Sequence, residues 1–252
     1  MQPLRDSLRP WGQALANLLF PLDCASCHFP LAASNGPSRL CHSCTEQLTP
    51  ITPPYCQRCA EPFPADPSLT IVCPNCQSRP TAFDFAFAGY ESRGPARDLI
   101  HNFKYNRQLH LRVVLGQLLL KALDEPRIQA RADWIITPVP LHARKLRDRQ
   151  FNQAQEIARR LHRHTQFPLV PGLRRQRDTT SQATLDRKGR LANLKDAFTL
   201  TPQARRQRLF ADRHILLIDD VLTTGATLHE CAQILKKEGQ AATVVGLCVA
   251  RG

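Results

Sequence analysis

The segment from Ile215 to Thr227, with the sequence ILLIDDVLTTGAT, constrains the fold of this chain more than any other stretch. Four apolar residues lead into two acids and then into a loop of small and hydroxyl-bearing residues. A helical pattern follows from Leu228 and is ended by Gly239. The segment therefore predicts a buried strand, a tight loop and a helix in direct succession, the building unit of α/β folds with parallel sheets.

The loop has the composition of a phosphate-binding loop. Backbone amides at the start of a helix lack internal partners and lie at the positive end of the helix dipole, so they attract a dianionic phosphate. A glycine lets the backbone approach the ligand closely. We therefore expect a phosphate to be bound by Thr223, Thr224, Gly225, Ala226 and Thr227.

Asp219 and Asp220 are the candidate catalytic residues. They would repel the phosphate if they pointed at it, so we expect them to accept hydrogen bonds from ribose hydroxyls or to help hold Mg²⁺. The alternative is structural: the acids merely end a strand and the threonines merely cap a helix. The joint pattern favours the binding site, because either half alone would be a weak signal.

Hydrophobic periodicity predicts an alternation of strands and helices after residue 80, and hence an α/β domain with a parallel sheet flanked by helices. We place the boundary near residue 80, between a module at 1–80 and a domain at 81–252. Strands are predicted at 83–90, 134–139, 214–218 and 243–250, and helices at 95–102, 109–123, 152–164 and 228–238.

Eight of the ten cysteines form Cys-x-x-Cys pairs in a tandem repeat, because adding 32 to the first four positions gives the last four. Two such pairs supply the tetrahedral thiolate shell that zinc prefers, and structural zinc contributes about 10–16 kcal/mol to folding. The sequence predicts one or two structural zinc ions held by Cys24, Cys27, Cys41, Cys44, Cys56, Cys59, Cys73 and Cys76.

The pairing of these ligands stays open at the level of sequence, since consecutive or interleaved pairs are both compatible with the spacing. Rival interpretations are redox chemistry at a Cys-x-x-Cys pair, and His28 or His42 replacing a cysteine ligand. Cys231 and Cys248 follow the inward pattern of a helix and a strand, so we expect both in the core.

The formal charge of +13 is concentrated after residue 80. The span 144–213 holds 18 basic and six acidic residues, which indicates either an ordinary solvated surface or a face for a polyanion such as nucleic acid. No apolar run is long enough to cross a bilayer, residues 11–20 resemble a short amphipathic helix, and no signal peptide is evident. We therefore expect a cytoplasmic protein without a transmembrane segment.

The segment 215–227 resembles the signature of type I phosphoribosyltransferases, which bind 5-phosphoribosyl 1-pyrophosphate. Further motifs resemble the ComF family of competence proteins over nearly the full chain. They are Phe103-Lys104-Tyr105, Pro138-Val139-Pro140 with His142, Arg149 before Phe151-Asn152-Gln153, and then Arg177, Thr180, Gln182, Arg187, Arg190, Asn193 and Phe198. One departure is Gln150, where the family usually has glycine.

This resemblance implies a type I phosphoribosyltransferase fold behind a double zinc ribbon, and a role in natural transformation beside a helicase partner. Two functions of different classes remain open, the first motivated by the uneven charge and the second by the Asp219/Asp220 pair. In the first, the protein handles single-stranded DNA, with the basic span on the phosphate backbone and Phe103 or Phe151 either stacking a base or, as we favour, in the core.

In the second function, the protein is an active phosphoribosyltransferase in which Mg²⁺ neutralises the departing pyrophosphate and the acceptor is unspecified. Its pyrophosphate contacts, or the DNA contacts of the first function, are expected at Lys104, Arg149, Arg177, Arg187 and Arg190. A glutamine-using amidophosphoribosyltransferase is disfavoured, because the first 80 residues leave no space for a glutaminase domain.

Overall fold

The computed structural model describes residues 23–31, 39–64, 73–77, 81–177 and 196–252. The helix predicted at 11–20 and the predicted contacts Arg187 and Arg190 lie outside these ranges. Among the described residues, no helix combines the length and the apolar character that crossing a membrane requires.

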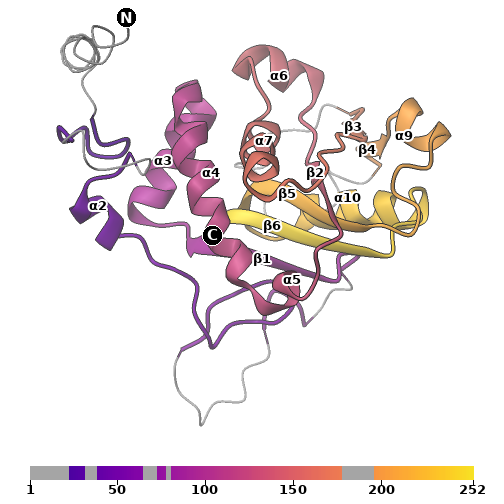
Figure 1. The fold of residues 1–252 in the computed structure, drawn as a ribbon, viewed down its shortest axis with the longest axis horizontal. Coiled ribbons are helices and arrows are strands. Elements are labelled where there is room, and N and C mark those ends of the chain that lie inside the picture. The colour runs from indigo at the N-terminus through magenta and orange to yellow at the C-terminus, as the bar shows by residue number, and fades with distance from the viewer. Residues whose placement is uncertain (1–22, 32–38, 65–72, 78–80, 178–195) are drawn as a thin grey trace, which may run out of the picture.

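A parallel sheet forms the centre of the described chain (Figure 1). Its strand order is β1 (Phe85–Glu91), β6 (Thr243–Arg251), β5 (His214–Leu222) and β2 (Trp134–Pro138). The residues of β6 are buried almost throughout, which is expected when helices cover both faces of a parallel sheet. The predicted α/β fold with a parallel sheet is confirmed.

Helices cover the two faces of the sheet (Figure 1). α4 (Arg112–Leu120) and α7 (Gln153–Thr165) lie together on one face, and α10 (Ala226–Lys237) lies behind the other. α3 (Gly94–Tyr105) follows β1. The single helix predicted at 109–123 is α4 with a 3₁₀ turn at each end, η1 (Leu109–Leu111) and η2 (Lys121–Asp124), because helix termini often tighten in this way.

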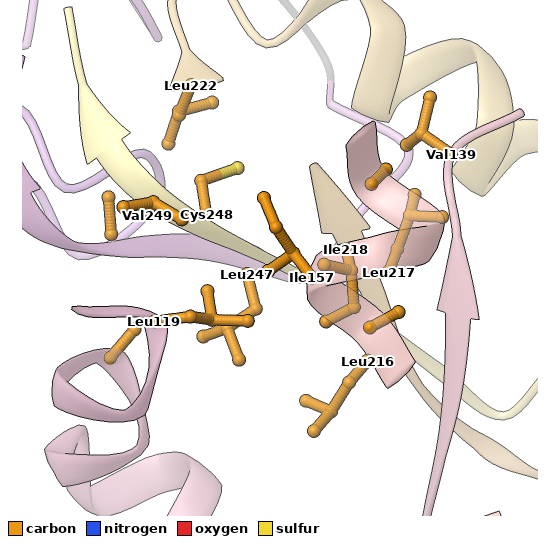
Figure 2. Packing of buried hydrophobic residues seen from close by; sticks show 14 of the residues in the cluster. Leu119, Val139, Ile157, Leu216, Leu217, Ile218, Leu222, Leu247, Cys248 and Val249 are labelled. Atoms are coloured by element: carbon orange, nitrogen blue, oxygen red, sulfur yellow. The ribbon is translucent and has the colours of Figure 1, made fainter. Parts of the chain in front are cut away.

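Figure 2 shows how the sheet and the helices share one apolar core. Leu119 of α4 and Ile157 of α7 approach Leu247 of the central strand β6, and all three are fully buried. Cys248 lies beside them, and Cys231 of α10 is also fully buried, as predicted for both cysteines. The same apolar cluster extends to Leu222 and Ala250, near the carboxyl ends of β5 and β6.

The prediction for β5 was wrong at its end, because the strand continues beyond residue 218 to Leu222. The acids Asp219 and Asp220 therefore lie within the strand and not after it. The extension occurs because β6 is equally long, and their pairing runs to Leu222 opposite Arg251. Hydrogen bonding to β6 thus fixes the backbone that carries both acids.

Several short elements carry too little periodicity for the sequence to predict them. They are α2 (His42–Glu46), α5 (Pro126–Gln129), α6 (Ala143–Arg149), α9 (Pro202–Arg206), and the antiparallel pair β3 (Leu173–Arg175) and β4 (Phe198–Leu200). α6 buries none of its residues, so it has no apolar face to detect. It projects at the top of the molecule in Figure 1.

The cysteine-rich module is anchored along β1, the edge strand of the sheet. The segment between its two halves pairs with this strand, since Ile51 N–H donates to Gly89 O at 3.1 Å and Glu91 N–H donates to Thr49 O at 2.8 Å. Farther along, Ala86 N–H donates to Arg58 O at 2.9 Å. These bonds cover an edge that would otherwise be open to other chains. The predicted boundary near residue 80 stays a prediction.

We expect Gln150→Gly to stabilise the protein, by about 0.5–1 kcal/mol. Gln150 ends α6 with φ of +69°, a left-handed conformation that glycine adopts readily and that other residues adopt at a cost. Chemical denaturation would measure the change. The matched control is Gln207→Gly at the end of α9, where φ is −89° and glycine relieves no strain. Equal effects of the two substitutions would contradict the strain at Gln150.

Candidate functional site

The loop between β5 and α10 has the geometry that the sequence predicts for an anion site. Gly225 is the N-cap of α10 with φ of +72°, so the turn requires a left-handed residue. A side chain there would also lie 3.4 Å from the ring of Phe83. After this turn, the first backbone amides of α10 have no carbonyl partners within the helix, as at every helix start. Such amides can donate hydrogen bonds to an anion.

A cavity of about 310 Å³ opens beside this loop. Seven predicted residues, Asp219, Asp220, Thr223, Thr224, Gly225, Ala226 and Thr227, all line it, and so do Lys104 and Arg149. Arg177 is described but does not line the cavity. The structure thus brings together nine of the predicted residues around one space at the carboxyl edge of the sheet.

The two acids occupy different environments within the cavity. Burial, followed by repulsion from Asp220, raises the pKa of Asp219 from 3.8 to about 7. Its carboxylate accepts a hydrogen bond from the Asp220 amide at 2.9 Å. Asp220 is 5% exposed, and its Oδ1 lies 2.8 Å from the Lys104 ammonium. Asp220 therefore has a cationic partner. The cost of burying two neighbouring carboxylates falls on Asp219, whose pKa is raised.

Lys104 is held at the end of α3 as the counter-ion of Asp220. Burial alone would lower the pKa of its ammonium, but the carboxylates of Asp220 and Asp219 together raise that pKa. The sequence predicts Lys104 as a pyrophosphate or DNA contact. The structure places its ammonium against the acid pair, where it offsets the negative charge of the free site.

The rim of the cavity holds residues that sequence reasoning did not select as site residues. Tyr105 is 58% exposed, and the Arg149 guanidinium lies 5.3 Å from the centre of its ring. Lys145 of α6 and Arg175 of β3 also line the cavity. Tyr105 stands beside Lys104 in a family motif, which is the signal that could have found it.

Phe103 and Phe151 belong to the core, as favoured from the sequence. Phe103 is fully buried, and its ring lies 4.9 Å from that of Phe151. Phe151 is partly buried and packs against the same core, so we assign neither ring a stacking role. The exposed ring at this site is that of Tyr105.

The cysteine pairs gather into two consecutive clusters. Cys24, Cys27, Cys41 and Cys44 form one, and Cys56, Cys59, Cys73 and Cys76 form the other, with all sulfurs of a cluster within 4.8 Å of one another. Interleaved pairing is thereby excluded. Neither His28 nor His42 belongs to a cluster in the described residues.

The sulfur spacing fits zinc. Cys27 and Cys41 lie 3.6 Å apart at Sγ, Cys59 and Cys73 lie 3.6 Å apart, and Cys56 and Cys76 lie 3.9 Å apart. A tetrahedron with Zn–S bonds of about 2.3 Å has edges of about 3.8 Å. Disulfide sulfurs would be only about 2.05 Å apart. The two clusters are structural zinc-ribbon sites, because no ligand position is left for a substrate.

Comparison with known proteins agrees with both parts of the chain. Residues 15–77 match the family model of the double zinc ribbon domain, and residues 151–251 match that of the phosphoribosyl transferase domain. The chain is 31% identical to competence protein F of Haemophilus influenzae over 224 residues, which cover 87% of this chain and 93% of that protein. The chain belongs to the ComF family.

Other members of the ComF family extend the likeness. The chain is 32% identical to the DNA utilization protein YhgH of Shigella flexneri, over 93% of this chain and 99% of that protein. It is 25% identical to the competence protein ComFC of Bacillus subtilis, over 84% of each chain. The resemblance seen in the sequence motifs is therefore confirmed over most of the chain.

In this ComF-family chain, the cavity combines an anion-binding loop, two acids and a basic rim. The loop amides suit a terminal phosphate, and the acids suit hydroxyl groups because carboxylates accept hydrogen bonds from them. The rim cations suit further phosphates. The arrangement can hold a sugar phosphate with its hydroxyls toward the acids, while chemistry at the sugar requires an acceptor that the residues do not identify.

We expect Asp219→Asn to stabilise the free protein more at pH 8 than at pH 5. In the folded protein the carboxyl is neutral well below its pKa of about 7 and charged above it, whereas in the unfolded chain it ionises near 3.8. The folded protein therefore loses stability as pH rises from 3.8 to 7. Asparagine removes this loss because it carries no ionisable group.

Thermal unfolding at the two pH values would measure this effect. About 1 kcal/mol of relieved repulsion raises Tm by about 2–4 °C in a chain of this size. Asp133→Asn is the control, since the side chain of Asp133 is 65% exposed. A Tm gain at pH 5 as large as that at pH 8 would contradict the raised pKa.

Proposed function

We propose that the protein binds 5-phosphoribosyl 1-pyrophosphate, or a related ribose phosphate, together with Mg²⁺ in the cavity at the end of β5. We further propose that it binds single-stranded DNA across the rim of this cavity and acts in DNA uptake during natural transformation. The observation that carries the proposal is the convergence of the loop 223–227, the acid pair and a basic, aromatic rim on one space.

The loop supports binding of the 5-phosphate. Gly225 turns the backbone into α10, and the amides and hydroxyls that follow converge on the cavity from one side. Asp219 and Asp220 lie on the adjacent strand end, where ribose hydroxyls would reach them. Placing the phosphate at the loop and the hydroxyls at the acids gives each polar group of the sugar a partner.

The acid pair also supports a role for Mg²⁺. Mg²⁺ is commonly bound by one or two carboxylates together with phosphate oxygens of a substrate. In the free site, Lys104 Nζ lies 2.8 Å from Asp220 Oδ1 and supplies the positive charge that Mg²⁺ would supply in the complex. We expect Mg²⁺ to arrive with the pyrophosphate and Lys104 to turn toward the ligand.

The rim supports binding of a single strand. α6 buries none of its residues and carries Arg144, Lys145, Arg147 and Arg149. Beside it, the exposed ring of Tyr105 offers a face on which a base can stack. Cations along a backbone path together with exposed aromatic rings are the usual means of binding single strands. The names of the relatives, competence protein and DNA utilization protein, agree with this partner.

A second candidate function is transfer of the phosphoribosyl group itself. The bond between C1 and the pyrophosphate oxygen would break, the electron pair would leave with pyrophosphate, and the lone pair of an acceptor nitrogen would bond to C1 as that nitrogen loses its proton to solvent. The acid pair at the cavity also suits this candidate, because Mg²⁺ held there would neutralise the departing pyrophosphate. The acceptor remains a nitrogen nucleophile of unspecified class.

We place the protein in the cytoplasm, because four-cysteine zinc sites need thiols that a reducing compartment maintains. A helicase partner, which the family resemblance implies, stays a prediction.

We expect the double variant Asp219→Asn/Asp220→Asn to lose binding of 5-phosphoribosyl 1-pyrophosphate with Mg²⁺ and to keep nearly full affinity for single-stranded DNA. The acids lie inside the cavity and repel a phosphate backbone, so their loss does not weaken contacts at the rim. Calorimetry and fluorescence anisotropy would measure the two affinities. The control Asp124→Asn/Asp133→Asn removes the same charge from the surface, at side chains 59% and 65% exposed. Unchanged binding of the sugar phosphate would refute the assigned site.

We expect Tyr105→Ala to weaken binding of single-stranded DNA, since stacking contributes about 1–3 kcal/mol per base. Affinity would fall by roughly 5–150-fold at constant salt. Tyr105→Phe is the control, because it keeps the aromatic face and loses the hydroxyl alone. Anisotropy titrations with labelled DNA would compare the two. If alanine bound as tightly as phenylalanine, Tyr105 would not be a stacking residue.

A further inference from the structure

We propose that the first zinc ribbon binds a backbone phosphate of the same single strand, in a basic cavity between the ribbon and the turn that follows α3. Phe29 would stack a neighbouring base. This inference rests on the proposed binding of single-stranded DNA and assigns to the ribbon a direct contact with that strand.

The cavity has a volume of about 250 Å³ and walls from two parts of the chain. The ribbon contributes His28 and Arg39, and the turn after α3 contributes Gln108 and His110. Each of these side chains can donate a hydrogen bond to a phosphate oxygen. The space is too small for a drug-sized ligand, which needs about 300–1,000 Å³, and suits a single compact group.

Three basic side chains line the cavity, those of His28, Arg39 and His110. Burial, and then the nearby charges of Arg39 and His28, lower the pKa of His110. His28, Arg39 and His110 take part in none of the ion pairs among the described residues. Asp23 also lines the cavity, and it too takes part in no ion pair there. A phosphate in this cavity would accept hydrogen bonds from His28, Arg39 and His110.

Next to the cavity, the ribbon presents an aromatic ring to solvent. Phe29 is 65% exposed, the largest exposure among the large apolar residues of the described chain. The backbone at this position belongs to the zinc knuckle, because Cys24 N–H donates to Phe29 O at 2.8 Å. An exposed aromatic ring offers a face on which a base can stack, and Phe29 directly follows His28, which lines the cavity.

The two cavities are close along the chain. Tyr105 lines the ribose-phosphate cavity, and Gln108 lines the cavity at the ribbon. Three residues of chain span at most about 11 Å. Between them lies the exposed Arg107, which makes no ion pair with a described residue. A strand that stacks on Tyr105 can therefore continue past Arg107 to the ribbon.

The basic residues have another potential role, which the test must separate from DNA binding. A zinc ion with four thiolates is net anionic, and Cys24 lines the same cavity. Arg39 therefore also offsets the charge of the zinc centre. Phe29 carries no charge and has no part in that compensation, so a variant at Phe29 separates the two roles.

The experiment measures binding of a fluorescent oligothymidylate to the full-length, zinc-loaded protein across a salt series. We expect Arg39→Gln to flatten the slope of log affinity against log salt by about 0.7, the value for one phosphate contact on a single strand. We expect Phe29→Ala to weaken binding on the order of tenfold without changing the slope. The control Arg131→Gln removes the same charge from an exposed residue near α5 and should keep the wild-type slope.

Zinc content and affinity for 5-phosphoribosyl 1-pyrophosphate are measured on every variant, and both should match the wild type. Wild-type slope and affinity in both ribbon variants would overturn the inference and leave this surface to a protein partner. Zinc loss in Arg39→Gln together with wild-type affinity in Phe29→Ala would also overturn it, because Arg39 would then serve the zinc centre alone. If the wild type bound no DNA at any salt, the proposed DNA function would fail as well.

Discussion

Two carboxylates lie side by side at the carboxyl end of a buried central strand, and the rest of the site depends on this arrangement. Burial and repulsion raise the pKa of Asp219 to about 7, and Lys104 pairs with Asp220. Such a pair is unfavourable in the free protein and persists because β5 and β6 hydrogen-bond up to Leu222 and Arg251. The sheet thus holds charge in a place where ribose hydroxyls or a cation can use it.

The zinc ribbons depend on the same sheet for their position. The segment between them pairs with β1, and a second bond joins Ala86 to Arg58. The Arg251 guanidinium donates hydrogen bonds to the carboxylate of Glu61 in the second ribbon and to the carbonyl oxygen of Leu222. One arginine at the end of β6 thereby links a zinc ribbon to the strand that carries the acids. The ribbons are accordingly placed to take part in binding near the cavity.

Much of this arrangement could be predicted from local sequence. The segment 215–227 encodes strand, loop and helix within thirteen residues, and the cysteine spacing encodes two metal sites. The length of β5 could not be predicted, because it is set by pairing with β6. The same holds for Tyr105 and Lys145, which become site residues only when α3 and α6 meet over the cavity. α6 itself was missed because it has no buried face.

The most direct test of the account is the affinity of the wild-type protein for single-stranded DNA in a salt series, with and without 5-phosphoribosyl 1-pyrophosphate and Mg²⁺. We predict that DNA binding falls steeply with salt, because it depends on contacts between cations and phosphates. We also predict that the sugar phosphate weakens DNA binding, because Tyr105 and Arg149 at the rim also line the cavity that it would occupy. Binding that is absent at low salt, or insensitive to salt, would contradict the proposed DNA function. The protein would then be better explained as a phosphoribosyltransferase that acts on small molecules.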